Sequence, residues 1–200
     1  MKKYKFVFDL DSTLTKQEIL PEIAKYLNKH EEISKITEET MLGKLSFEES
    51  FRKRVDILKT IPIKKVREII AKIEFNEALV DFIRENIDRC IIVTGNLDIW
   101  ISELMETLGF ENIYYSSNAK YNGDLLDGIS KVIKKEEILE SIPEDIVAIG
   151  DGSNDIGMVK KAQIGIGFGG VRPIAPGLLD VCDYAFYKEE RLCQFLKQLL

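Results

Sequence analysis

The chain has 200 residues, of which 45% are hydrophobic and 31% are charged, and its formal net charge is −6. These values predict one globular domain, or one domain carrying an insertion, and they argue against extensive disorder. The negative charge also argues against nucleic acid or an anionic membrane as a partner.

The start of the chain and its cysteines predict a cytoplasmic protein. The first residues, MKKYKFVFDLD, lack a long apolar segment and a small-residue cleavage site, so we expect no signal peptide. No stretch approaches the roughly 18 apolar residues that a membrane span needs. The three cysteines are widely spaced among apolar neighbours, which favours buried thiols over a disulfide framework or a zinc site. They are Cys90, Cys182 and Cys193.

The stretch KFVFDLDSTLT, residues 5–15, combines an apolar run with two carboxylates. The apolar run predicts a buried strand, and Asp9 and Asp11 stand at its carboxyl end with hydroxyls directly behind. In open α/β sheets that end of a strand is where ligands bind. We therefore interpret Asp9 as a nucleophile or a metal ligand. An ordinary strand-to-turn transition is the alternative, because Asp and Ser favour turns.

Residues 15–75 differ in character from the rest of the chain, because their apolar residues recur at helical spacing and no strand pattern occurs among them. Ser46 followed by Glu49 predicts a capping box at the start of the second helix. We therefore expect a helical insertion. Its predicted helices are Glu18 to Leu27, Phe47 to Leu58 and Lys64 to Ile73.

From residue 76 onward, strand and helix patterns alternate, which predicts a parallel sheet covered on both faces. The expected strands are 90–93, 146–149, 163–168 and 184–186, with a hairpin over 113–126 that turns at Asn122-Gly123. The expected helices are 77–85 capped by Asn76, 97–108 closed by Gly109, 131–141, 155–162 and one at the end of the chain.

Three of the expected strands end in polar loops, DLDST, TGN and GDGSND. We expect these loops to meet at one edge of the sheet. Asp9 and Asp151 can hold Mg²⁺, which prefers carboxylate and backbone oxygens. Thr94 and the amides around Gly95 can form a phosphate cradle, and a nearby lysine would complete the neutralisation. One carboxylate would then attack phosphorus while another handles protons.

The order of these motifs, DxDST, TG, a lysine and GDGxND, resembles that of the haloacid dehalogenase-like phosphatases over nearly the whole chain. The insertion and its local sequence are most similar to phosphoserine phosphatase. The resemblance implies an α/β fold with a doubly wound parallel sheet and a helical cap inserted after the first strand. Residues 1–14 and 76–200 would form the core and 15–75 the cap. It also implies a Mg²⁺-dependent hydrolase of a small phosphorylated metabolite, acting in serine biosynthesis.

The resemblance implies a role for each matching polar residue. Asp9 attacks the phosphate and becomes an aspartyl phosphate. Asp11 protonates the leaving alkoxide and then takes a proton from the water that hydrolyses the intermediate. The side chains of Asp9 and Asp151 and the backbone oxygen of Asp11 bind Mg²⁺. Asp155 lies behind these ligands and orients metal-bound water, and Asn154 contacts the phosphate.

The phosphate-binding lysine has more than one candidate, because Lys131, Lys134 and Lys135 all precede the third motif strand. The segment that begins at Lys135, KEEIL, best matches the family's lysine followed two residues later by an acid and an apolar pair. We expect Lys135 to fill this role. Lys134 and a purely solvent-facing role are the alternatives.

In phosphoserine phosphatases a glutamate after the first motif and an arginine in the cap grip the amino and carboxylate groups of serine. Glu18 and Arg54 stand at the matching places, and Phe47 matches an aromatic that closes over the substrate. An arginine fork suits a carboxylate and a glutamate suits an ammonium. Alternatively, Glu18 merely favours a helix start and Arg54 is an exposed cation.

Two residues depart from the family pattern and leave the substrate open. Asn96 stands where a second glycine is usual, and Arg172 precedes Pro173 where Lys-Pro is more usual. The same chemistry on phosphohomoserine or phosphoethanolamine is therefore an alternative. A phospho-accepting receiver-type signalling module is disfavoured, because its accepting aspartate lies on a later strand and it carries no helical cap of this size.

Overall fold

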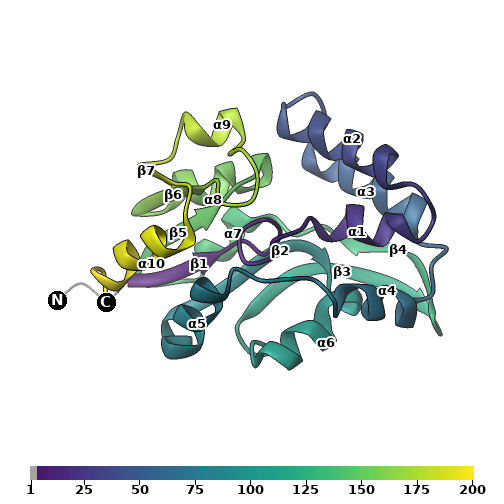
Figure 1. The fold of residues 1–200 in the computed structure, drawn as a ribbon, viewed down its shortest axis with the longest axis horizontal. Coiled ribbons are helices and arrows are strands. Elements are labelled where there is room, and N and C mark those ends of the chain that lie inside the picture. Colours follow the sequence, from purple (N-terminus) through teal and green to yellow (C-terminus); the bar gives the residue numbers. More distant parts are fainter. Residues whose placement is uncertain (1–3) are drawn as a thin grey trace.

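The computed structural model describes residues 4–200, and its described strands form one seven-stranded sheet in the order β4-β3-β2-β1-β5-β6-β7 (Figure 1). Neighbouring strands are parallel except β3 and β4, which are antiparallel. The predicted α/β fold with a mostly parallel sheet is confirmed. The strands are β1 Tyr4–Phe8, β2 Cys90–Leu97, β3 Tyr114–Asn122, β4 Leu125–Lys131, β5 Asp145–Gly150, β6 Ile164–Phe168 and β7 Tyr184–Phe186.

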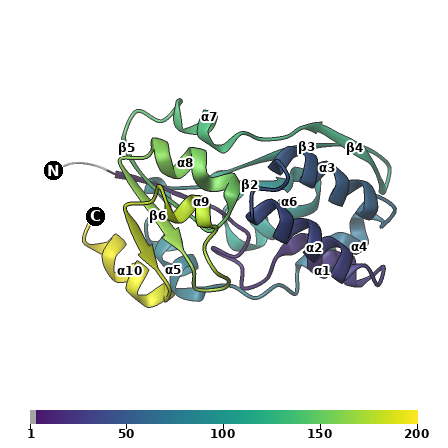
Figure 2. The same cartoon turned by 90° about the horizontal axis from the view of Figure 1, so that it is seen from above.

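Helices cover both faces of this sheet, with α7 and α8 on one side and α5 and α10 on the other (Figure 2). Short 3₁₀ turns occur at Ile87–Arg89 and Ser153–Asp155. The helices are α1 Ile19–Lys25, α2 His30–Met41, α3 Phe47–Leu58, α4 Ile63–Ile70, α5 Glu77–Glu85, α6 Asp98–Leu108, α7 Lys135–Leu139, α8 Ile156–Lys161, α9 Pro176–Leu179 and α10 Glu189–Lys197.

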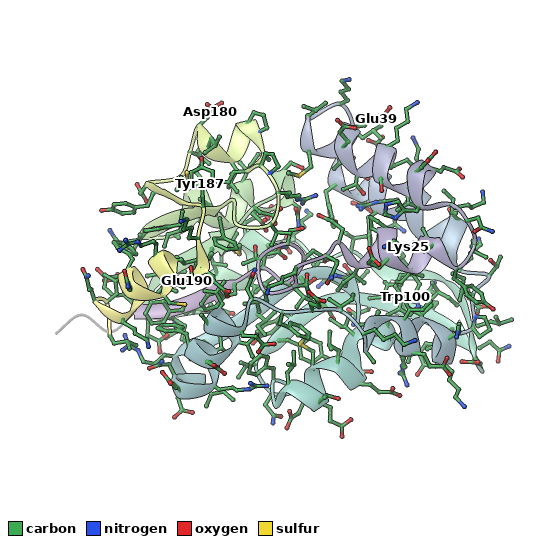
Figure 3. All side chains as sticks on the ribbon, in the orientation of Figure 1. Lys25, Glu39, Trp100, Asp180, Tyr187 and Glu190 are labelled. Carbon is green, nitrogen blue, oxygen red and sulfur yellow. The ribbon has the colours of Figure 1, made fainter. Side chains whose placement is uncertain are left out.

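The central strand β1 supplies side chains to two hydrophobic cores. Phe6 and Phe8 enter the larger core, where Phe6 meets the ring of Phe82 edge to face at 5.3 Å, whereas Val7 enters the smaller core on the opposite face. A strand buried on both faces needs a continuous apolar run, as this sequence has. Trp100, labelled in Figure 3, is buried in the larger core.

The insertion of α1 to α4 leaves the sheet and returns to it at one place, beyond the carboxyl end of β1. Thr15 and Phe75 form an isolated antiparallel bridge. The Lys16 amide also donates to the Glu74 carbonyl at 2.8 Å. These contacts hold the two ends of the insertion together, and Figure 1 shows α1, α2 and α3 grouped on one side of the molecule.

Two predicted helix caps are confirmed, the capping box of α3 and Gly109, which ends α6 with a φ of 77°, and a third is wrong. At the start of α3, Ser46 Oγ accepts from the Glu49 amide and the Glu49 carboxylate accepts from the Ser46 amide, each at 3.3 Å, so the capping box is present. Asn76 does not cap α5 with its side chain. Its Nδ2 donates instead to the Thr13 carbonyl at 2.8 Å, because the chain returns there to the first motif loop.

The predicted hairpin is present, but its loop lies one residue later than expected. Asn122 pairs with Leu125, which leaves Gly123 and Asp124 as the loop. Gly123 has a positive φ of 59° and Asp124 does not, which is the pattern of a type II′ turn. Asp124 also binds the first turn of α4, where its carboxylate accepts from the Lys64 amide at 2.8 Å.

The helix predicted over residues 131–141 is much shorter in the structure. Lys131 pairs with Asn118 at the end of β4, and α7 spans only Lys135–Leu139. Pairing with β3 therefore keeps the first of these residues extended.

Two of the three cysteines are buried as expected. Cys90 and Cys193 lie in the core, whereas Cys182 is only partly buried, and no disulfide joins any of them. None of the helices within residues 4–200 combines the length and the apolar character that crossing a bilayer requires.

Candidate active site

The three motif loops meet at one edge of the sheet, as the sequence predicts. β1 lies between β2 and β5, with Phe8 paired to Ile92 on one side and Ile149 on the other. Residues directly after β1 and β5, and Gly95 and Asn96 within β2, which runs four residues beyond its expected end at 93, line one cavity of about 40 Å³. The insertion forms its other wall. The lining residues are Asp9, Asp11, Glu18, Leu20, Thr37, Thr40, Met41, Phe47, Phe51, Arg54, Gly95, Asn96, Ser153, Asn154 and Arg172.

Lys135, and not Lys134, reaches the carboxylates at the base of this cavity. Its side chain is 2% exposed, and its Nζ donates to Asp9 and, at 2.6 Å, to Asp155 Oδ1. Lys134 lies at the surface, with its Nζ 3.4 Å from Glu137. The helix α7 begins at Lys135, and this start turns the side chain inward.

The carboxylates of Asp9, Asp151 and Asp155 form a buried cluster whose oxygens lie within 4.8 Å of one another. Asp155 Oδ2 accepts from the amides of Asp151 and Gly152 at 3.1 and 2.9 Å, which fixes the loop after β5. Asp151 Oδ1 is buried and has no hydrogen-bond partner within residues 4–200. A buried acceptor without a donor among hard oxygen ligands fits a cation such as Mg²⁺.

Burial raises the pKa values of three acids at this site. The pKa of Asp9 lies well above its usual value because of burial first and the charge of Asp155 second. Burial, together with a nearby carboxylate, raises the pKa of Asp11 to about 6. Burial raises the pKa of Asp151 to about 7, although the Arg172 guanidinium opposes the shift. A bound cation would hold the carboxylates of Asp9 and Asp151 ionised.

Asp11 is held by the chain on both sides of the first motif. Its Oδ1 accepts from the Ile19 amide at the start of α1 at 2.8 Å, and its Oδ2 accepts from Asn96 Nδ2. Ser12, directly after it, has a positive φ of 54°, a conformation that is uncommon for serine. This turn directs the chain from β1 toward the insertion.

Thr94 and Gly95 lie near the end of β2, under the first residue of α3. Thr94 is fully buried, and its Oγ1 accepts from the Asn96 amide at 3.2 Å. The ring of Phe47 rests on Gly95 so closely that a Cβ at this position would overlap the ring. Phe47 itself stacks on Phe51, with the ring centroids 5.4 Å apart. A larger residue at position 95 would therefore displace the Phe47 ring where the insertion touches the motif loop.

Arg54 is buried, so the alternative that it is an exposed cation is wrong. Its side chain is directed inward from α3, with Nη1 donating to Thr37 Oγ1 at 3.0 Å and Nε to the Ser50 carbonyl at 3.4 Å. Burial lowers its pKa. No carboxylate within residues 4–200 forms an ion pair with it. The charges of Glu18 and Asp11 act on it without an ion pair, and its hydrogen bonds are all to neutral groups, so the guanidinium can still bind an anion.

Arg172 takes a part in the site that the sequence did not predict. Its Nε donates to Asp151 Oδ2 at 2.5 Å, and its Nη1 pairs with Glu18, whose carboxylate also accepts from Ser12 Oγ at 3.1 Å. Arg172 thus joins the acid cluster to the entrance of the insertion. Its departure from the family pattern was the only signal in the sequence.

The comparisons with known proteins agree with this geometry. The family described as haloacid dehalogenase-like hydrolase matches residues 6–160. A phosphoserine phosphatase of Methanocaldococcus jannaschii is 41% identical over 195 residues, which are 90% of this chain and 92% of that protein. The alignments with two solved structures each cover 99% of this chain and 99% of the chain in the solved structure. One is a phospho-aspartyl intermediate analogue of phosphoserine phosphatase, with 37% identity and a TM-score of 0.85, and the other a substrate-bound phosphoserine phosphatase complex, with 36% and 0.84.

Proposed function

Because the chain belongs to the haloacid dehalogenase-like hydrolases and its relatives are phosphoserine phosphatases, it is a phosphoric monoester hydrolase, and we propose that its substrate is O-phosphoserine. The observation that carries this proposal is the buried guanidinium of Arg54, which faces the same cavity as Asp9 and has no carboxylate partner within residues 4–200. The serine carboxylate would supply that partner.

We propose that residues 15–75 act as a cap over a core of residues 1–14 and 76–200. The bridge between Thr15 and Phe75 supports this division, because it closes the insertion where the division falls. α3 would bring Phe47 and Arg54 to the substrate, while the core loops would bring the reacting groups. The substrate would then be enclosed between the two parts, away from bulk water.

In the first step, an oxygen of Asp9 would bond to phosphorus while the bond from phosphorus to the serine oxygen breaks. Asp11 would give its proton to that leaving oxygen, and a pKa near 6 leaves part of this carboxyl protonated near neutral pH. A positioned acid accelerates the loss of a poor leaving group by about 10²- to 10⁴-fold. The product of this step is an aspartyl phosphate on Asp9.

In the second step, water would attack phosphorus and the bond to Asp9 would break, releasing inorganic phosphate. Asp11, now ionised, would take the proton of that water. Lys135 would offset the charge of Asp9, and the Thr94 hydroxyl, the Gly95 amide and Asn154 would bind the phosphate oxygens. Each of these groups is at the cavity or directly beneath it.

We propose that the side chains of Asp9 and Asp151, with the backbone oxygen of Asp11, hold Mg²⁺ and that Asp155 supports them from behind. The cation would reduce the repulsion between an ionised Asp9 and a phosphate dianion. The unpartnered oxygen of Asp151 supports this assignment. Asp155 is already engaged by Lys135 and two loop amides, which suits a supporting role.

Phosphate release from a panel of small phosphomonoesters tests the substrate. The panel contains O-phosphoserine, phosphohomoserine, phosphoethanolamine and p-nitrophenyl phosphate, each with Mg²⁺ and with EDTA. We expect the highest kcat/KM for O-phosphoserine and loss of turnover in EDTA. A preference for phosphoethanolamine, which has no carboxylate, would contradict the role of Arg54. Stable phosphorylation of the protein without turnover would instead favour a receiver-type function.

Asp9→Asn serves as the control for the chemistry, since it removes the nucleophile and changes little volume. Turnover of every panel member should be abolished while thermal unfolding still shows a folded protein. Activity equal to that of the unmodified protein would exclude Asp9 as the nucleophile.

A further inference from the structure

Asn96 lies near the end of β2 and joins two reacting groups through one side-chain amide. It is 2% exposed. Its Nδ2 donates to Asp11 Oδ2 and, at 3.1 Å, to Thr94 Oγ1. The donor end of the amide faces Asp11, which suits the ionised carboxylate, because that form only accepts hydrogen bonds. Both hydrogens of Nδ2 are therefore used within the site.

The contact with Asn96 fixes the orientation of the Asp11 carboxyl group. The Ile19 amide binds Oδ1 and Asn96 binds Oδ2. With the first bond alone the carboxyl group could still rotate about its bond to Cβ, because terminal torsions of this kind are broad. The second bond removes that freedom. The lone pairs that stay unbound then keep a constant direction relative to the cavity.

Asn96 also determines how the Thr94 hydroxyl can act. Thr94 Oγ1 accepts from both the amide and the Nδ2 of Asn96. Its acceptor positions are thus filled, while its own hydrogen has no acceptor among the hydrogen bonds of residues 4–200. The hydroxyl can therefore only donate to a ligand, as binding of a phosphate oxygen requires.

Stability alone does not account for this asparagine. Its Oδ1 is buried and has no hydrogen-bond partner within residues 4–200. An acceptor left in this way costs free energy that a glycine or an alanine would not incur. Residues that lower stability in return for geometry are typical of functional sites.

We propose that Asn96 is a positioning residue for phosphoryl transfer, which sets Asp11 to protonate the leaving oxygen and sets Thr94 to donate to the phosphate. This inference rests on the proposed phosphatase chemistry, but it does not depend on which alcohol is the natural substrate.

The test compares a poor leaving group with a good one. The poor one is whichever alkyl phosphate of the panel the unmodified protein hydrolyses fastest, and the good one is p-nitrophenyl phosphate, which hardly needs an acid. For Asn96→Ala we expect the single-turnover rate to fall about 10- to 100-fold on the alkyl phosphate, as loss of a positioned acid implies. The rate of p-nitrophenol release should fall less than about 10-fold, with KM little changed for both.

Asn96→Asp keeps the size of the side chain but replaces the donor with a second carboxylate facing Asp11, so it should be slower than Asn96→Ala on the alkyl phosphate. Asn86→Ala is the matched control. The side-chain amide of Asn86, like that of Asn96, donates a hydrogen bond, but its acceptor is the Phe82 carbonyl, far from the cavity. Its rates should match the unmodified protein. The proposal would be overturned if Asn96→Ala lowered the rates on both substrates equally, or if Asn96→Asp hydrolysed the alkyl phosphate faster than Asn96→Ala. The alkyl phosphate is chosen by its rate with the unmodified protein and not by its identity. The test of Asn96 can therefore still be carried out if O-phosphoserine turns out not to be the substrate.

Discussion

Lys135 lowers the electrostatic cost of burying Asp9 and Asp155 close together. Burial alone would lower its pKa, but the carboxylates of Asp155 and Asp9 outweigh burial and raise it. The ammonium therefore stays charged without contact with water. Lys135 beneath the cluster and Arg172 at its rim offset part of the repulsion between the carboxylates that share this small volume.

Arg54 gives the sharpest test of substrate recognition at the residue scale. Arg54→Ala should raise KM for O-phosphoserine by about 10- to 100-fold, since a charged hydrogen bond contributes about 1.5–3 kcal/mol. KM for p-nitrophenyl phosphate, which has no carboxylate, should change far less. Steady-state kinetics on both substrates measure the difference.

Arg52→Ala is the control for this change, because Arg52 lies on the same helix but points outward and pairs with Glu48. It should leave both KM values as they are. If Arg54→Ala raised the two KM values equally, recognition of a carboxylate would be excluded. Glu18→Gln should act like Arg54→Ala but more weakly, because Glu18 already pairs with Arg172 and Ser12.

The positions of the residues in the strand-end motifs could be predicted from the sequence. Asp9 and Asp151 follow β1 and β5, and Thr94 lies near the end of β2. The apolar runs of these strands make their type evident, so the topology alone brings the three residues together. The roles of Asn96 and Arg172 could not be predicted in this way. Each depends on a side chain that meets a partner from a distant segment, and one sequence gives no sign of such pairs.

At the scale of elements, a local sequence signal predicted the structure only where no distant segment competed for the same groups. The capping box of α3 lies within four residues and is present. The start of α4 is satisfied by Asp124, about 60 residues away, and the amide of Asn76 is taken by Thr13. The helix expected from residue 131 begins late because pairing with β3 overrides its helical pattern.

The capping box of α3 predicts a measurable contribution to stability. Ser46→Ala removes the hydroxyl that accepts from the Glu49 amide and should lower the free energy of unfolding by about 1 kcal/mol. For a chain of this length the melting temperature should fall by about 2–4 °C. Denaturant and thermal unfolding measure both quantities.

Thr107→Ala is the control for the capping box, because the Thr107 hydroxyl only binds back to the Glu103 carbonyl within α6. Its effect should stay within about 0.5 kcal/mol. An unchanged stability of Ser46→Ala would show that the box does not hold the start of α3.

The same helix also lines the cavity. Phe47, its first residue, rests on Gly95 and so forms part of the cavity wall.

At the scale of the whole molecule, the net charge of −6 opposes the approach of an anionic substrate. The local field at the cavity has to reverse this effect. Lys135, Arg54 and Arg172 place three positive charges within or beside it, and these offset part of the charge of the carboxylates there, which are Asp9, Asp11, Glu18, Asp151 and Asp155. A bound Mg²⁺ would add two further positive charges and so help the site to attract an anion.

The buried acids link the stability of the whole protein to pH and to Mg²⁺. The folded pKa values of Asp11 and Asp151, about 6 and about 7, lie above the usual value of 3.8. The folded protein therefore binds more protons than the unfolded chain between these values, and its stability falls as pH rises from about 4 through 7. The surface glutamates with lowered pKa values titrate below this range and do not cancel the effect.

We accordingly expect the melting temperature in EDTA to fall between pH 5 and pH 8. In Mg²⁺ the fall should be smaller, since a cation that binds the ionised acids stabilises the folded state in proportion to the logarithm of its concentration over Kd. Asp151→Asn should lose most of this Mg²⁺ effect, whereas Asp145→Asn, at the opposite end of β5, should retain it. Thermal unfolding across this pH range measures both the fall of the melting temperature and the effect of Mg²⁺ on it. Identical pH profiles with Mg²⁺ and with EDTA would show that the cation does not bind these carboxylates, because ionised acids in this cluster cannot accept a divalent cation without a gain in stability.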